Sequence, residues 1–208
     1  MKPGKTRAAA QDLPSLESVR NMVLASLLAA LMAAGAWIAV PVGPVPVVLQ
    51  NMFVLLAGLL LGPRWGAASV AVYLLAGLAG LPVFSGGGGG PGHFLGPTGG
   101  YLVAYLPAVW LVGLLSNAGG RVQDANHRPG RAMAMDVLAM AVGMILVYAL
   151  GVARLQAVTR LPWNRAVALG MLPFLPGDAL KIAAAAAIAR MARPLLGREN
   201  APAPGPHG

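Results

Sequence analysis

The chain has 208 residues, of which 57% are hydrophobic and only 10% are charged. Soluble domains usually carry about 25% charged residues, so the composition excludes a soluble globular protein and indicates an integral membrane protein. The formal net charge of +9 does not indicate nucleic-acid binding, because the basic residues lie between apolar runs and are not interleaved with aromatic side chains. Cysteine is absent, which excludes disulfides and thiol catalysis.

The chain begins with a polar segment, residues 1–19, that we expect to be a disordered leader in the cytoplasm. The apolar run from Met22 to Val40 follows it. This run is longer than the core of a secretory signal peptide, which has about 7–15 residues, so we expect it to be retained as the first membrane span. Residues 198–208 are dominated by Pro and Gly and are predicted to be a disordered tail.

Between these ends, residues 20–197 are predicted to form one transmembrane domain. We expect an all-α fold, a bundle of six membrane-spanning helices, because apolar runs of about 20 residues are what helical spans need. The six segments are about 21–40, 47–62, 65–81, 99–117, 132–153 and 166–193. Only Gly62-Pro63-Arg64 separates the second from the third, which predicts a helical hairpin.

The distribution of Lys and Arg predicts the orientation of the bundle. Basic residues occupy the leader, the connections 62–64 and 118–131 and the end of the last segment, whereas 41–46 and 82–98 contain none. Because cytoplasmic loops of membrane proteins carry the excess of Lys and Arg, both termini are predicted to be cytoplasmic. The connection 154–165 is an exception, since its three arginines would face outward.

The connection 82–98 is long, uncharged and rich in glycine, with five consecutive glycines from Gly86 to Gly90. One interpretation is a slack linker. The other is a lid over an outward-facing cavity, which the large apolar side chains of Phe84, Phe94 and Leu95 favour.

The last apolar segment carries an acid and a base, Asp178 and Lys181, three residues apart. Charged side chains inside a membrane cost about 2.5–3.5 kcal/mol each on insertion scales, and residues three apart share a helix face. The pair can therefore neutralise itself or bind a polar ligand jointly. Pro173 and Pro176 predict a break in the helix just before the pair, and broken helices at membrane depth commonly line ligand cavities.

Other polar residues of the apolar segments are candidates for the same cavity, although each alone is more typical of an interhelical hydrogen bond. They are Gln50, Asn51, Tyr73, Thr98 and Tyr101. We interpret Asp136 and Arg154 as interfacial, because they lie nearer to helix ends.

Motifs of enzymes are absent from the sequence. There is no H-E-x-x-H, no acid-rich metal cluster and no phosphate-binding loop, so we expect neither catalysis nor ATP hydrolysis, and no cofactor or metal. Ser85 and His93 suggest a serine protease only weakly, because both lie beside a flexible glycine run that does not fix their geometry.

The first segment has small residues at every fourth position, in two ridges. One ridge comprises Ala25, Ala29 and Ala33, and the other Ser26, Ala30 and Ala34. Such ridges let helices approach closely in lipid. They are interpreted either as packing within the bundle or as a docking surface for a partner membrane protein.

Four blocks together resemble the BioY family: VPVGPVPVVLQNMFVLLAGLLLGPRWG (40–66), VYLLAGLAGLPVF (72–84), GPTGGYL (96–102) and FLPGDALK (174–181). This family is the biotin-specific substrate-capture component of energy-coupling-factor (ECF) transporters. The resemblance implies biotin capture in a bacterial cytoplasmic membrane. It also implies partnership with a transmembrane coupling subunit, which docks on the small-residue ridges, and with ABC ATPases.

The resemblance also implies a binding site. We expect Asp178 to accept a ureido N–H of biotin and Lys181 to donate to the ureido oxygen or, alternatively, to the carboxylate. Gln50, Tyr73, Phe84 and Tyr101 would line the pocket, with the backbone of Thr98 and Gly99 available to the other end of the ligand. The sequence departs from the family pattern in its longer glycine run and in Asn51, where many relatives carry Thr.

Two other functions stay open at this point. The chain could be an autonomous or proton-coupled secondary transporter that uses Asp178 and Lys181 as a relay. It could also be a membrane scaffold in which the pair merely neutralises itself.

Overall fold

The computed structural model describes residues 15–118 and 129–197. The predicted tail 198–208 and most of the predicted leader lie outside these ranges. The first helix, α1 (Leu16–Trp37), begins before the expected boundary at residue 20, because the hydroxyl of Ser15 accepts a hydrogen bond from the Ser18 backbone N–H at 3.2 Å. This is an ordinary N-cap, which satisfies a donor that the first helical turn leaves free.

The second helical element, α2 (Gln50–Leu78), turns back on itself at Gly62. Gly62 has φ 73° and ψ −172°, and Pro63 follows it. A Cβ on Gly66 would lie 3.0 Å from the carbonyl oxygen of Ala57, although nine residues of straight helix span about 13.5 Å. The predicted hairpin is therefore confirmed. Its two arms lie so close together that a larger residue at Gly66 would make a tight contact with the opposite backbone.

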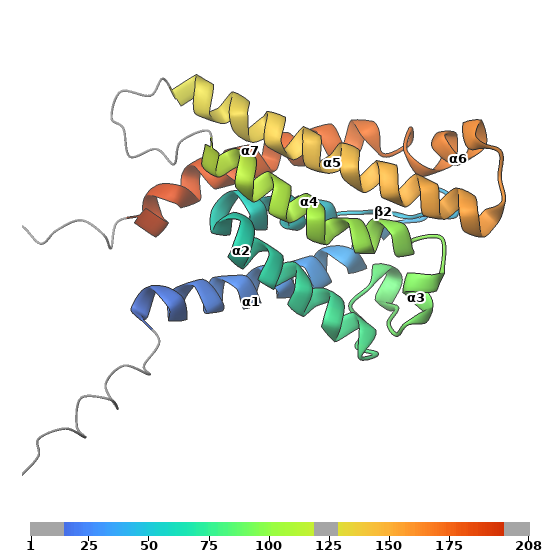
Figure 1. Ribbon diagram of the computed structural model, residues 1–208, viewed down its shortest axis with the longest axis horizontal. Helices are drawn as coiled ribbons and strands as arrows, with labels where there is room; N and C mark the ends of the chain where they lie inside the picture. The colour runs from blue at the N-terminus through green and yellow to red at the C-terminus, as the bar shows by residue number, and fades with distance from the viewer. Residues whose placement is uncertain (1–14, 119–128, 198–208) are drawn as a thin grey trace, which may run out of the picture.

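The remaining helices are α3 (Gly92–Leu95), α4 (Gly99–Ala118), α5 (Pro129–Thr159), α6 (Trp163–Gly170) and α7 (Leu175–Gly197). Within the described residues, four helices are long and apolar enough to cross a membrane: α1, α2, α4 and α5. The pair α6 and α7, bent by 44°, makes a possible fifth. Figure 1 shows the beginning of α1, the end of α4, the beginning of α5 and the end of α7 at one end of the molecule.

The predicted break in the last apolar segment is present between α6 and α7. The helix stops after Gly170, turns through residues 171–174 and restarts at Leu175. Pro176 falls in the first turn of α7, where its missing N–H is not needed. The backbone N–H of Asp178 donates to the carbonyl of Phe174 at 2.8 Å. This bond places the carboxylate beside the break.

A short antiparallel ribbon, which was not predicted, connects α1 to α2. It pairs β1 (Ala39–Val40) with β2 (Val47–Val48), so α2 begins at Gln50 and not at residue 47. The ribbon lies just before the first turn of α2, and its residue Val48 lines the cavity described below.

The glycine-rich connection between α2 and α4 is folded, so the interpretation as a slack linker is wrong. Phe84 is 1% exposed, and its backbone N–H donates to the carbonyl of Gly88 at 2.8 Å. The connection contains the one-turn helix η1 (Ser85–Gly87) and then α3. Trp37 of α1 donates from Nε1 to the carbonyl of Pro82 at 2.9 Å. Leu95, by contrast, is 70% exposed and does not contribute to the interior.

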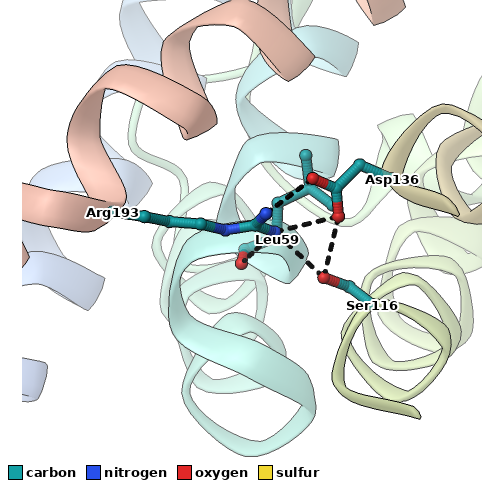
Figure 2. Close-up of polar contacts among 4 residues, drawn as sticks. All are labelled: Leu59, Ser116, Asp136 and Arg193. Atoms are coloured by element: carbon teal, nitrogen blue, oxygen red, sulfur yellow. Dashed lines mark hydrogen bonds and ion pairs between the residues drawn. The ribbon is translucent and has the colours of Figure 1, made fainter. Parts of the chain in front are cut away.

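A partly buried ion pair links helices at the end of the molecule where α7 finishes. Arg193 of α7 contacts both carboxylate oxygens of Asp136 of α5, at 2.6 and 2.9 Å, and the hydroxyl of Ser116 of α4 at 3.0 Å (Figure 2). Its guanidinium also donates to the carbonyl of Leu59 in α2 at 3.4 Å. Asp136 is 6% exposed and paired, so its charge is neutralised inside the bundle, near the end of the molecule.

The two small-residue ridges of α1 have different surroundings. Ala25 and Ala29 are buried in the bundle, and the Ser69 hydroxyl of α2 donates to the carbonyl of Ala25 at 2.8 Å. These two residues therefore serve internal packing and are not available to a partner. Ala33 is half-buried, whereas Ala30 and Ala34 are exposed.

Candidate functional site

A cavity of about 530 Å³, including its open mouth, lies between the ribbon, the glycine-rich connection, α2, α4, α5 and the α6–α7 turn. Ligand pockets are mostly apolar with a few polar groups. Its lining residues are Val45, Pro46, Val48, Gln50, Asn51, Phe84, Ser85, His93, Thr98, Tyr101, Leu102, Tyr105, Tyr148 and Phe174. The cavity has the mixed apolar and polar lining of a small-molecule site.

Five of the candidate residues named from the sequence line this cavity: Gln50, Asn51, Phe84, Thr98 and Tyr101. The Tyr101 hydroxyl donates to the carbonyl of Gly170 at 2.7 Å. This leaves the aromatic ring as the part of Tyr101 that can contact a ligand. The bond also holds the end of α6 against α4.

Tyr73 and Gly99 have supporting positions. The ring of Tyr73 packs edge-on against Phe84, with 5.6 Å between centroids, so Tyr73 supports a wall residue. A Cβ on Gly99 would lie 2.0 Å from the carbonyl oxygen of Phe94. Glycine at this position therefore allows the glycine-rich connection to pack against the start of α4.

Asp178 and Lys181 form an ion pair directly behind the wall. Lys181 Nζ lies 2.8 Å from Asp178 Oδ1 and 2.7 Å from the carbonyl oxygen of Val48. The other carboxylate oxygen, Oδ2, accepts a hydrogen bond from the hydroxyl of Tyr148. Tyr148 and Val48 both line the cavity, so the pair contacts the wall through two lining residues.

This ion pair keeps capacity for further hydrogen bonds. An ammonium has three donors, and Lys181 uses two of them. A carboxylate offers about four acceptor positions, and Asp178 has two donors on it. The pair is thus neutral and satisfied, yet one donor and further acceptor positions remain for a ligand that reaches it.

A hydrogen bond between α2 and α4 fixes a second polar group of the wall. The hydroxyl of Tyr105 donates to Asn51 Oδ1 at 2.6 Å. Beside it, the buried amide of Gln50 interacts with the buried hydroxyl of Tyr73, without reaching the geometry of an ordinary hydrogen bond.

Sequence reasoning missed several wall residues. Tyr105 had a usable signal, because it follows Tyr101 by four residues and so shares its helix face. Tyr148 and Phe174 had none: each is one aromatic residue in an apolar run, and only packing brings it to the cavity. The ribbon residues were missed because the ribbon itself was not predicted.

The structure shows the contacts of His93 and Arg154, two polar residues named in the sequence analysis. Ser85 and His93 both line the cavity, but His93 Nδ1 contacts the carbonyl of Gly89 at 3.1 Å, an arrangement that pins the glycine run. Arg154 lies at the end of α5 and donates to the carbonyl of Leu95 at 2.6 Å, which caps α3. Among the described residues, no three His, Asp or Glu side chains gather as metal ligands would.

Comparisons with known proteins agree on one family. The sequence model of the BioY family matches residues 6–198. A probable biotin transporter BioY of Pyrococcus horikoshii is 39% identical over 82% of this chain and 94% of its own length. A biotin transporter BioY of Thermotoga maritima is 36% identical, again over 82% and 94%. The crystal structure of an S-component for biotin from an ECF-type ABC transporter superposes with a TM-score of 0.79, at 30% identity, over 87% of this chain and 94% of that one.

Proposed function

The chain belongs to the BioY family, and on this basis we propose that it binds biotin and takes it up as the substrate-binding subunit of an ECF-type transporter. One observation in the structure supports this proposal most directly. A buried Asp178–Lys181 pair lies at the restart of a broken helix and contacts the wall of an open cavity. Polar groups of this kind at a broken helix are typical ligand-binding elements of membrane transporters.

In the proposed complex, the Asp178–Lys181 pair binds the ureido ring of biotin. Asp178 accepts a ureido N–H, and the third donor of Lys181 reaches the ureido oxygen. Charge-assisted hydrogen bonds of this kind are about twice as strong as neutral ones. The rings of Phe84, Tyr101 and Phe174 would pack against the apolar part of the ligand.

We place the mouth of the cavity on the outer side of a bacterial cytoplasmic membrane. With each arm of α2 counted as a crossing, the bundle has six spans and both termini are cytoplasmic. The basic residues Arg64 and Arg193 then lie at the cytoplasmic end, as the positive-inside rule requires, and residues 82–98 act as an outward lid.

The exposed ridge of α1, Ser26, Ala30 and Ala34, is the proposed docking surface for a transmembrane coupling subunit that joins the chain to ABC ATPases. Small residues let a partner helix approach closely in lipid. The chain has no phosphate-binding loop of its own, so ATP hydrolysis would come from these partners.

The first experiment is equilibrium binding of labelled biotin to the purified chain in detergent, alongside Asp178→Asn. Leaving Lys181 without its charged partner should cost about 2–5 kcal/mol of binding, which is about 30-fold to several thousand-fold in affinity. Glu17→Gln, at an exposed carboxylate at the start of α1, is the matched control. Wild-type affinity in a folded Asp178→Asn variant would refute the site, and no binding by the wild type would refute biotin as the ligand.

A proton-coupled secondary transporter is the second candidate, favoured by the hydrogen-bonded series Tyr148, Asp178 and Lys181, along which a proton can move. Uptake of biotin into vesicles that lack the ATPases, driven by a proton gradient, would support it. Uptake that requires the ATPases and is indifferent to the gradient would exclude it.

A further inference from the structure

The first turn of α2 presents two side-chain amides to the cavity, those of Gln50 and Asn51. They come from adjacent residues directly after the ribbon, where the chain enters the helix. Tyr105 of α4 lies across from them, is 4% exposed and itself lines the cavity. The polar part of this wall therefore includes two amides and one buried hydroxyl.

The hydroxyl of Tyr105 fixes the orientation of the Asn51 amide. It donates to Asn51 Oδ1 at 2.6 Å, and a hydroxyl has only one hydrogen to donate. The oxygen side of the amide is therefore turned toward Tyr105, and the NH2 group is turned elsewhere. No hydrogen bond within the described residues uses Asn51 Nδ2, so both its N–H donors are available to a ligand.

The neighbouring Gln50 lines the same wall and is buried, and its side-chain amide interacts with the hydroxyl of Tyr73. Among the described residues, the amide donors left for a ligand at this point of the wall are therefore those of Asn51. An acceptor oxygen of the ligand would form hydrogen bonds with these N–H groups. A ligand with a donor at that position would place donor against donor and form none.

We propose that Asn51, positioned by Tyr105, determines specificity by donating from its NH2 group to the ureido carbonyl oxygen of biotin. This inference rests on the proposed function. The position of Asn51 favours contact with the ureido end of biotin, because Lys181 donates a hydrogen bond to the carbonyl of Val48 at 2.7 Å, three residues before Asn51. The end of the ligand held by Asp178 and Lys181 is then the end within reach of Asn51.

The neutral surroundings of Asn51 favour the ureido carbonyl of biotin, and not its carboxylate, as the group that accepts the hydrogen bond from Asn51. Asn51, Gln50 and Tyr105 are neutral, and Lys181, the nearby cation, already neutralises Asp178. A buried carboxylate without a partner charge is strongly disfavoured, whereas neutral amide donors suit a neutral carbonyl. The carboxylate of biotin therefore lies toward the open mouth.

The test compares biotin with 2-iminobiotin, in which a protonated nitrogen replaces the ureido oxygen, and with biotinol, which lacks the carboxylate. Equilibrium binding is measured for the wild type, Asn51→Asp and Tyr105→Phe in detergent, at a pH at which 2-iminobiotin is cationic. Asn51→Asp replaces the donor by an acceptor. We expect it to shift the ratio of biotin affinity to 2-iminobiotin affinity at least 100-fold toward 2-iminobiotin.

Tyr105→Phe keeps the ring but frees the Asn51 amide to rotate. We expect it to weaken biotin binding about tenfold and to reduce the discrimination against 2-iminobiotin, an effect that a purely structural role would not produce. The ratio of biotin to biotinol should stay unchanged in both variants. Asn164→Asp, at an exposed position of α6, is the control and should change neither ratio.

The outcomes separate this inference from the proposed function. If the wild type binds no biotin, both are overturned. If the wild type binds biotin and neither Asn51→Asp nor Tyr105→Phe alters the 2-iminobiotin ratio, only the role of Asn51 is overturned. A change confined to the biotinol ratio also overturns it, because Asn51 would then contact the carboxylate. If Asn51→Asp does not fold, the ratios for Tyr105→Phe decide alone.

Discussion

At the scale of single residues, the charge in the cavity wall is balanced before any ligand enters. Asp178 receives one donor on each oxygen, from Lys181 and Tyr148, so its rotamer is held from two sides. A preformed carboxylate spares the ligand the cost of ordering it. The same contacts keep an acid and a base inside an apolar bundle without leaving either charge unpaired.

Tyr148→Phe tests whether the Tyr148 hydroxyl holds the Asp178 carboxylate in place before the ligand binds. The change removes one donor from Asp178 and keeps the ring in the wall. Because hydrogen bonds to charged groups contribute about 1.5–3 kcal/mol, we expect biotin affinity to fall about 10- to 100-fold. Equilibrium binding checks this, with Tyr101→Phe as the control, since that hydroxyl bonds to Gly170 and not to Asp178. Equal losses in the two variants would contradict a specific role for Tyr148.

At the scale of elements, the glycine-rich connection packs around one aromatic side chain. Phe84 packs against Tyr73 of α2 and Phe94 of the same connection, with ring centroids 5.6 Å apart in both pairs. It reaches this position because Gly77 of α2 has no side chain. The connection is thus shaped by this close packing together with backbone hydrogen bonds of its glycines, such as those from Gly87 to Phe84 and from Gly90 to Gly77.

Gly77→Ala should therefore disturb the connection. A Cβ on Gly77 would lie 2.0 Å from Phe84 Cζ, so the ring must move away, while alanine favours the helix by about 1 kcal/mol over glycine. We expect α2 to remain intact and biotin affinity to fall at least tenfold. Gly43→Ala, where a Cβ would meet nothing within 4 Å, is the control. Unchanged affinity in Gly77→Ala would show that Phe84 does not shape the site.

At the scale of the whole molecule, the end of α7 is joined to three other helical elements by a single guanidinium. Arg193 contacts α2, α4 and α5 (Figure 2), about 18 Å along the helix from Lys181 at 1.5 Å per residue. The helix that carries the ion pair of the site is therefore anchored at its far end by a second ion pair.

We expect Asp136→Ala to lower the unfolding free energy by about 3 kcal/mol. Breaking a buried ion pair typically costs 3–5 kcal/mol, and the value falls at the lower end because the Arg193 side chain is 33% exposed. Thermal unfolding in detergent measures the loss. The double variant Asp136→Ala, Arg193→Ala should lose less than the sum of the single variants, because the two residues interact. Additive losses would contradict the pairing.

The sequence by itself determined the membrane class, the hairpin at Gly62, the break before Asp178 and the family. Each depends on local composition or spacing: long apolar runs, Gly-Pro between two of them, two prolines in one turn, and four blocks in order. Physical rules that act over a few residues are enough for these features. Asp178 and Lys181 were paired correctly for the same reason, since residues three apart share a helix face.

Only the tertiary structure decided what surrounds that pair and which faces are free. Tyr148, Tyr105 and Val48 reach the site from separate elements. Their contacts join residues 30 or more positions apart in the chain, and spacing along the sequence does not predict such contacts. The burial of Ala25 and Asp136 depends likewise on which helix packs against which. These contacts arise because a close-packed interior must fill space and pair most of its buried polar groups, and both requirements depend on how all the helices pack together.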